Sequence, residues 1–208
     1  QNIINDFEEG RIDILVGTQM ISKGLDFDNV SLVGILNADN MLHFPDFRSY
    51  ERAFQIMTQV AGRAGRKGDR GKVIIQSYDE NHEIINQVKN HDYKLMCEKQ
   101  LEERKIFNYP PYCRIILINI QHKNERKLDA ISNQFASSMK KSFGNRVLGP
   151  ESPGISKIRR YYHKNILLKI ENTSSIKDAK KILSQIILKY RDLKDFRSAR
   201  INMDVDPY

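Results

Sequence analysis

Two arginines stand three positions apart in the sequence Gln59-Val-Ala-Gly-Arg-Ala-Gly-Arg66. On a helix or a tight turn, Arg63 and Arg66 point in the same direction, and the glycines beside them let a backbone or a ligand approach closely. Guanidinium groups donate paired hydrogen bonds to phosphate oxygens. The spacing therefore favours a phosphate-binding pair. The alternative is a helix that ends at glycine, where basic residues complement the helix dipole.

A second polar cluster follows a short apolar run. Residues 13–17 (DILVG) have the composition of a buried strand. The cluster after them contains Thr18, Gln19, Lys23, Gly24 and Asp26. Ligands of parallel sheets collect beyond the carboxyl ends of the strands. The cluster is thus a candidate ligand-binding loop, and a solvated turn is the alternative.

Basic and aromatic residues alternate in Lys157-Ile-Arg-Arg-Tyr-Tyr-His-Lys164. Cations contact phosphates, and aromatic rings stack on unpaired bases, so this run is a candidate nucleic-acid site. Its candidate residues are Lys157, Arg159, Arg160, Tyr161 and Lys164. The alternative is a hairpin whose tyrosines pack on helices and whose charges are solvated.

The charge distribution also favours nucleic-acid binding by the second half. The 208 residues carry a net charge of +8, which divides into −3 for residues 1–108 and +11 for residues 109–208. Such asymmetry is typical of polyanion-binding proteins, although a basic solvated face is the simpler alternative.

The elements expected in residues 1–108 alternate between helix and strand. Buried-type strands and amphipathic helices in alternation predict an α/β domain with a parallel sheet and flanking helices. The expected elements are a helix at Ile3–Glu9, strands at Asp13–Gly17, Ser31–Leu36 and Lys72–Gln76, a helix at Ser49–Val60, and a charged helical connector at Asn81–Phe107.

The run Asn108-Tyr-Pro-Pro-Tyr112 ends the connector, because consecutive prolines cannot continue a helix, and we place a domain boundary there. Residues 109–208 then have the order βαββαβ, which predicts a ferredoxin-like α+β domain. Its expected elements are a strand at Arg114–Gln121, a helix at Glu125–Phe143, a strand or turn at Val147–Ser152, hairpin arms at Lys157–Tyr162 and Asn165–Glu171, a helix at Ser175–Leu193 and a strand at Arg200–Val205.

Several classes of protein are disfavoured. The chain has no apolar stretch of about 18 residues or more and no signal-peptide pattern, so we expect no membrane association. Its two cysteines and five histidines lack zinc-ligand spacing. Free thiols without an export signal favour the cytoplasm. Since the sequence begins with Gln1, we expect a fragment of a longer protein.

The segments GTQMISKGLDF and QVAGRAGR resemble motifs V and VI of superfamily 2 helicases, in which two RecA-like lobes enclose ATP. The stretches FPDFRSYERAFQ, LEERKIFNYPPY and MDVDP extend the resemblance over the whole chain, to the PriA family of replication-restart DNA helicases. The resemblance implies part of the second RecA-like lobe in residues 1–108 and a domain similar to ribosomal protein S10 in residues 109–208.

The resemblance also implies roles for individual residues. Arg66, with Arg63 beside it, matches the arginine finger that acts on the γ-phosphate of ATP. Gln59 would also line the ATP cleft. Gly24 and Asp26 match nucleotide-side positions of motif V, and Thr18 and Gln19 match positions that contact the DNA backbone.

The expected ligands follow from the same family. They are ATP with Mg²⁺, held mainly by the first lobe, and branched and single-stranded DNA. Zinc is expected in the full-length protein but has no ligands in this chain. Single-stranded-DNA-binding protein and other primosome proteins are the expected partners.

Two catalytic motifs are absent from these 208 residues: the phosphate loop G-x-x-x-x-G-K-[ST] and the D-E-x-H motif that binds Mg²⁺. We therefore expect no ATP hydrolysis by this chain alone. Two alternatives stay open, a RecG-like translocase of superfamily 2 and a non-catalytic nucleic-acid-binding protein with an S10-like module. An RNA-recognition motif is disfavoured, because residues 165–170 (NILLKI) lack the aromatic residues that such sheets present.

Overall fold

The computed structural model describes residues 2–18, 30–65, 71–191, 193 and 196–207. The chain divides into two compact units, residues 1–103 and 104–208, and each is described by itself. Gln19, Gly24, Asp26 and Arg66, all candidate site residues, lie outside the described residues. Within the described part of the chain, no helix is both long and apolar enough to span a membrane.

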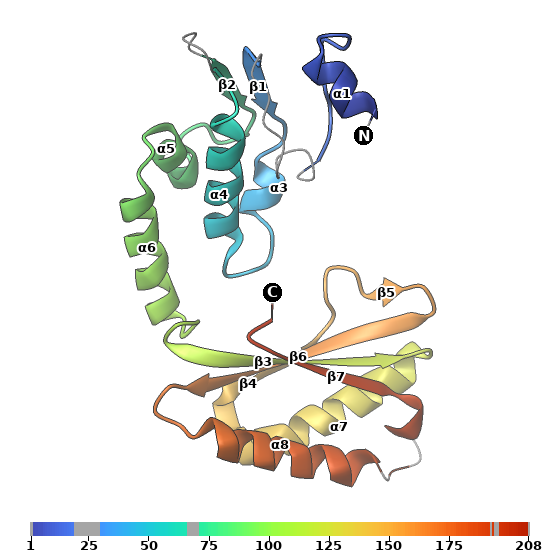
Figure 1. Ribbon diagram of the computed structural model, residues 1–208. Coiled ribbons are helices and arrows are strands. Elements are labelled where there is room, and N and C mark those ends of the chain that lie inside the picture. The colour runs from blue at the N-terminus through green and yellow to red at the C-terminus, as the bar shows by residue number, and fades with distance from the viewer. Residues whose placement is uncertain (1, 19–29, 66–70, 192, 194–195, 208) are drawn as a thin grey trace. The chain divides into compact units, whose positions relative to one another are not determined.

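The first unit contains a short parallel sheet with helices (Figure 1). Strands β1 and β2 pair in parallel, with Leu32 beside Lys72 and Ile35 beside Ile75. The described elements are α1 (Asn2–Glu8), β1 (Leu32–Ile35), α3 (Asp39–Leu42), α4 (Ser49–Ala61), β2 (Lys72–Ile75), α5 (Glu83–Lys89) and α6 (Tyr93–Ile106), the last of which runs into the second unit. Helix α4 forms because its apolar residues recur at helical spacing, and its buried face carries Ala53, Phe54 and Met57.

The core of the first unit joins these elements. Phe54 and Met57 of α4 pack with Ile35 of β1 and with apolar residues of α5 and α6. Met57 is fully buried. This packing fixes α4, and therefore the turn that follows it, against the strands.

One expectation for the first unit is wrong. Residues 13–17 form no strand, and Ile14 and Val16 are 76% and 80% exposed. Their apolar composition is not sufficient, because a strand needs a neighbour that pairs with its backbone groups, and β1 pairs with β2 in this region. The expected helical connector at Asn81–Phe107 is helical and consists of two helices, α5 and α6, which are separated by residues 90–92. His91 has a φ of 54°, which a continuous helix does not permit.

The second unit is a mixed α/β layer structure in which two helices cover one face of a sheet (Figure 1). The sheet order is β4-β6-β3-β7, with β5 paired to β6, and the pairs are antiparallel. The elements are β3 (Cys113–His122), α7 (Glu125–Phe143), the 3₁₀ turn η1 (Gly144–Arg146), β4 (Val147–Glu151), β5 (Lys157–Ile158), β6 (Tyr161–Glu171), α8 (Ile176–Arg191), the 3₁₀ turn η2 (Phe196–Ser198) and β7 (Arg200–Val205).

Local signals explain the bounds of α7. The side chain of Asn124 accepts a hydrogen bond from the Lys127 N–H (3.0 Å), which caps the first turn. Gly144, with a φ of 61°, ends the helix in a backbone conformation that favours glycine. The apolar face between these ends packs on the sheet through residues that include Phe135, which is fully buried and contacts the Tyr190 ring edge-on.

The expected hairpin is present, but its turn is displaced. The arms were expected at Lys157–Tyr162 and Asn165–Glu171, whereas β6 begins at Tyr161 and the turn consists of Arg159 and Arg160. The reason is long-range pairing: β6 pairs with β3 along its whole length, from Tyr162 beside His122 to Glu171 beside Cys113. That partner is distant in sequence, so local patterns do not specify it.

Candidate functional site

The turn after α4 carries the first of the two paired arginines. Helix α4 ends at Ala61, and the next residue, Gly62, caps it with an N–H that donates to Thr58 O. Arg63 follows, with its N–H donating to Val60 O (3.1 Å). Gly65 then donates to Val30 O (3.0 Å), beside the amino-terminal end of β1. Arg63 is thereby placed at the amino-terminal edge of the two strands, and its side chain is partly exposed.

The turn after α4 passes so close to residue 71 that only glycine fits at that position. A Cβ at position 71 would lie 2.2 Å from the Gly65 nitrogen and 2.3 Å from the Ala64 carbonyl carbon. Backbone atoms cannot move away as a side chain can, so any other residue would displace the turn. The close approach holds residues 62–65 against the start of β2. Gln59 lies one turn earlier on α4 and is exposed, so Gln59 and Arg63 are both accessible from one end of the helix.

The structure therefore describes three members of the first unit's predicted site: Gln59, Arg63 and Thr18. Thr18 is exposed and lies in a segment without helix or strand. The positions of Gln59 and Arg63 are consistent with a site at the end of α4. The predicted partners Gln19, Gly24, Asp26 and Arg66 lie outside the described residues, so their placement stays a prediction.

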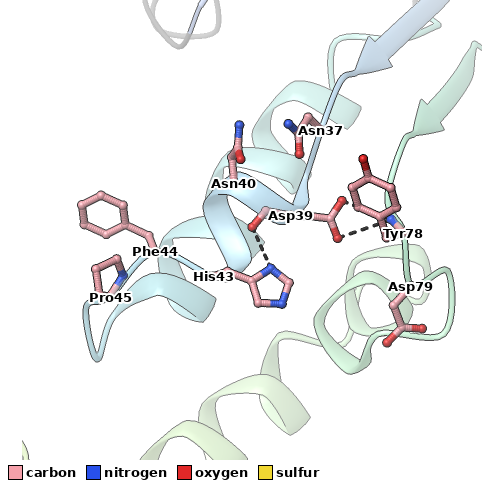
Figure 2. Close-up of a pocket in the computed structure, with 8 residues that line it drawn as sticks. All are labelled: Asn37, Asp39, Asn40, His43, Phe44, Pro45, Tyr78 and Asp79. Carbon is pink, nitrogen blue, oxygen red and sulfur yellow. Dashed lines mark hydrogen bonds between the residues drawn. The ribbon is translucent and has the colours of Figure 1, made fainter. Parts of the chain in front are cut away.

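A pocket that the sequence did not indicate lies at the opposite, carboxyl-terminal edge of β1 and β2 (Figure 2). Its volume is about 760 Å³, and it is lined by Asn37, Asp39, Asn40, His43, Phe44, Pro45, Tyr78 and Asp79. The signal that could have found it is the polar sequence directly after the β1 strand, since carboxyl ends of parallel strands collect ligands.

Asp39 is held rigidly in this pocket. Its carboxylate accepts hydrogen bonds from Ser77 Oγ (2.9 Å) and the Tyr78 N–H (3.1 Å). Partial desolvation favours the neutral acid, but these hydrogen bonds outweigh it and lower the pKa of Asp39 below its ordinary value. The bonds connect α3 to the segment after β2, so this carboxylate is part of the framework of the first unit.

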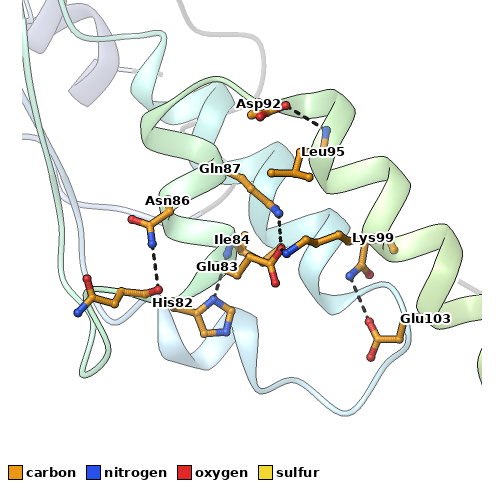
Figure 3. A network of polar contacts seen from close by, with 11 residues as sticks. His82, Glu83, Ile84, Asn86, Gln87, Asp92, Leu95, Lys99 and Glu103 are labelled. Atoms are coloured by element: carbon orange, nitrogen blue, oxygen red, sulfur yellow. Dashed lines mark hydrogen bonds and ion pairs between the residues drawn. The ribbon is translucent and has the colours of Figure 1, made fainter.

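Polar contacts also join α5 to α6 (Figure 3). His82 Nδ1 accepts from the Ile84 N–H (3.2 Å) and caps α5. Glu83 accepts from Gln87 Nε2 (2.8 Å) and forms an ion pair with Lys99 of α6. The Glu83–Lys99 ion pair joins the two helices, and none of these contacts involves the predicted site residues.

In the second unit, the β5–β6 turn presents Arg159 and Arg160 to solvent. Both side chains are exposed, and neither has a hydrogen-bond or ion-pair partner among the described residues. Arg159 adopts a φ of 56°, the left-handed conformation of a tight turn. Their positive charges are therefore available to an anionic ligand.

The other predicted residues of the hairpin have partners within the unit. Lys157 donates to Tyr162 Oη (3.1 Å), with its ammonium 4.6 Å from the ring centroid. Lys164 lies on the helix-covered face and forms an ion pair with Asp129 of α7 (3.1 Å). A phosphate must compete with Asp129 for Lys164, so the geometry favours the turn arginines as the stronger anion contacts.

Two basic residues that the sequence did not indicate lie close to the Tyr161 ring. Arg200, the first residue of β7, lies over the Tyr161 ring at 4.4 Å from its centroid. Lys123, between β3 and α7, lies 5.9 Å from the same centroid. Both belong to elements distant in sequence, and only the sheet register places them beside the hairpin.

Among the described residues, no group of three or more His, Cys, Asp or Glu side chains could hold a metal ion. Gln59 and Arg63, the described members of the site predicted at the end of α4, carry an amide and a guanidinium whose N–H groups suit phosphate oxygens.

Comparison with known proteins defines the class first. Residues 1–68 match the helicase conserved C-terminal domain, and residues 105–208 match the C-terminal domain of primosomal protein N. Three relatives, each named replication restart protein PriA, align over 99–100% of the chain: those of Bacillus subtilis (38% identical), Synechocystis sp. (38%) and Treponema pallidum (34%).

The chain therefore belongs to the primosomal protein N (PriA) family, and the resemblance derived from its motifs is confirmed. It spans 26%, 24% and 31% of the length of these three relatives, respectively. Among solved structures, the designed protein Foldit4 aligns with 46% of the chain at a TM-score of 0.35 and 11% identity, too weak a likeness to bear on the fold.

Proposed function

We propose that this chain is the C-terminal part of an ATP-dependent 3′→5′ DNA helicase, which recognises stalled or repaired replication forks and starts primosome assembly for replication restart. The observation that carries the proposal is the order of the two family matches along one chain, a helicase C-terminal domain followed by the primosomal protein N C-terminal domain. The names of the full-length relatives support it.

In this proposal, the first unit is part of the second RecA-like lobe and supplies one side of the ATP site. ATP, with Mg²⁺, supplies the phosphoryl group whose transfer releases free energy. Arg63 is held by the turn against Gly71, and Arg63 and Arg66 donate hydrogen bonds to phosphate oxygens. An arginine that stabilises the charge on a transferred phosphoryl group contributes about 10³- to 10⁵-fold in rate. Gln59, Gly24 and Asp26 complete this side of the site.

The chain lacks the phosphate loop and the D-E-x-H motif, so these residues complete a site whose other side is elsewhere in the enzyme. We infer that the 208-residue chain alone does not hydrolyse ATP. Thr18 and Gln19 contact the DNA backbone and couple it to the nucleotide state. Closure and opening of the two lobes then move the enzyme along one strand.

The second unit is assigned to fork binding, with a ferredoxin-like fold similar to ribosomal protein S10. The exposed turn arginines and the Tyr161–Arg200 pair provide cations and an aromatic ring for branched and single-stranded DNA. Single-stranded-DNA-binding protein and other primosome proteins are the proposed protein partners, and the cytoplasm is the proposed location. A RecG-like translocase and a non-catalytic binding protein are less consistent with the names of the relatives.

Duplex unwinding by the full-length protein tests the proposal. A forked substrate with one labelled strand is incubated with protein and ATP, and strand release is measured on tails of either polarity. We expect ATP-dependent release from a substrate with a 3′ single-stranded tail and much less from its 5′-tailed counterpart. ATP-independent release, or a preference for the 5′ tail, would contradict the proposed function.

A further inference from the structure

In the second unit, one end of the sheet face opposite α7 and α8 carries a ladder of polar side chains. Residues directly paired across antiparallel strands share a face. Ile118 and Ile166 pair on the face covered by α7 and α8, so the rows at odd positions of β3, which alternate with this one, project from the other face. Toward Arg200, the first of these rows contains Asn202, Asn119, Asn165 and Glu151 of β4, and the second contains Arg200, Gln121 and His163.

The amides of this ladder form a directed chain of hydrogen bonds. Gln121 Nε2 donates to Asn119 Oδ1 (2.7 Å), and Asn119 Nδ2 donates to Asn165 Oδ1 (2.8 Å). This chain orients the amides of Gln121, Asn119 and Asn165. It leaves the Nδ2 donors of Asn165 and the Oε1 acceptor of Gln121 without a partner among the described residues. A donor and an acceptor held on adjacent rows of one face can hydrogen-bond to the edge of a flat polar ligand.

The other end of the same face is covered by the chain itself. Lys169 donates to Phe107 O (2.9 Å), and its ammonium lies 3.7 Å from the centroid of the Tyr109 ring. Asn172 Nδ2 donates to Pro111 O (2.7 Å). The segment around Tyr109 thus closes the end near Cys113, which is 2% exposed. None of these contacts reaches the polar ladder.

An aromatic ring with two basic side chains beside it adjoins the polar ladder. Tyr161 precedes His163 by two positions on β6 and therefore lies on the same face. Arg200 lies over its ring, and Lys123 is close to it. In the rows of Tyr161 and His163, the described residues include no carboxylate. The charge of this corner therefore complements an anionic ligand.

We propose that the polar ladder and the adjoining Tyr161 ring bind an unpaired nucleotide of single-stranded DNA. The base stacks on the Tyr161–Arg200 pair, and its edge hydrogen-bonds to Asn165 and Gln121. The adjoining phosphates contact Lys123 and the exposed turn arginines. The proposal rests on the proposed function, since it gives the single strand of a fork a specific place on the second unit. It differs from phosphate binding alone, because it requires a base.

An abasic strand separates these two modes of binding. Fluorescence anisotropy of the full 208-residue chain compares a labelled thymidine strand of about 12 nucleotides with an abasic strand of the same length and charge. We expect the thymidine strand to bind at least about fivefold more tightly, the lower end of what one stacked base contributes. Equal affinity for both strands would overturn the proposal and leave a charge-based function of the hairpin intact.

Variants then locate the preference. The double variant Tyr161→Leu/Asn165→Ala is expected to bind the thymidine strand as weakly as the abasic one, with abasic binding unchanged. The matched control Asn133→Ala, which removes an exposed amide of α7, is expected to keep the full preference. Thermal unfolding confirms that each variant is folded. A folded double variant that keeps the preference would overturn the proposal. If the wild-type chain binds neither strand, both this site and the DNA-binding role of the second unit are refuted, whereas strand release by the full-length protein tests the helicase function separately.

Discussion

The turn arginines Arg159 and Arg160 yield the most quantitative prediction. Both side chains are exposed, and neither has a hydrogen-bond or ion-pair partner among the described residues, so each guanidinium can contact one phosphate of a bound strand. Each phosphate contact to single-stranded DNA contributes about −0.7 to the slope of log K against log[salt]. The double variant Arg159→Ala/Arg160→Ala should therefore bind with a slope reduced in magnitude by about 1.4.

The same relation gives the loss of affinity. Two contacts correspond to about a fifteenfold weakening at 0.15 M salt and about a sixtyfold weakening at 0.05 M, if their contribution disappears near 1 M. Alanine keeps the Cβ that Arg159 already has in its left-handed conformation, so the substitution adds no backbone strain at that position. The stability of the second unit should therefore be unchanged, and the effect can be assigned to charge.

Anisotropy titrations of the 208-residue chain with a single-stranded oligonucleotide, at several salt concentrations, measure the slope. The matched control is Lys140→Ala/Lys141→Ala, which removes the same charge from exposed positions near the end of α7. We expect this control to keep nearly the wild-type slope. An unchanged slope for the arginine variant would refute the assignment. An equal reduction by the lysine variant would show that net charge, rather than the hairpin, sets the affinity.

Two further predictions concern the framework of the second unit. Phe135→Ala should lower the free energy of unfolding of this unit by about 3–5 kcal/mol, because the ring is fully buried against Tyr190. Urea denaturation measures this free energy, and a loss below about 1 kcal/mol would contradict the buried position of the ring. Burial raises the pKa of the Cys113 thiol, which donates to Asn108 O (3.0 Å), so a thiol reagent at neutral to mildly alkaline pH should modify the more exposed Cys97 first. The neutral thiol stabilises the fold below the ordinary thiol pKa, and this contribution should be lost as the pH rises through the raised value. Faster labelling that disappears in Cys113→Ser rather than in Cys97→Ser would contradict this order.

Local sequence signals predicted many of the elements. Helix α7 has its expected bounds because Asn124 caps its first turn and Gly144 directly follows its last residue. Both signals are local in the sequence. Strand β7 also has its expected bounds, Arg200–Val205. Residues 13–17 show the limit of such signals, since their apolar run forms no strand without a pairing neighbour.

The candidate site was less predictable than the elements. The hairpin residues were found from their alternating basic and aromatic types, but Lys123 and Arg200 were missed, because the register of β3 with β6 and β7 brings them to Tyr161. The pairing of Lys164 with Asp129 likewise follows from the packing of α7 on the sheet. Such contacts depend on tertiary structure, which local spacing does not encode.

Substitution of Arg66 tests the central claim most directly. That claim is that this chain completes the ATP site of a fork-binding helicase. Full-length protein carrying Arg66→Ala is compared with wild type for DNA-stimulated ATP hydrolysis and, in parallel, for affinity to a forked DNA. We predict that hydrolysis falls by about 10³-fold or more, while fork affinity changes less than about twofold. Retained hydrolysis together with lost fork affinity would contradict the account.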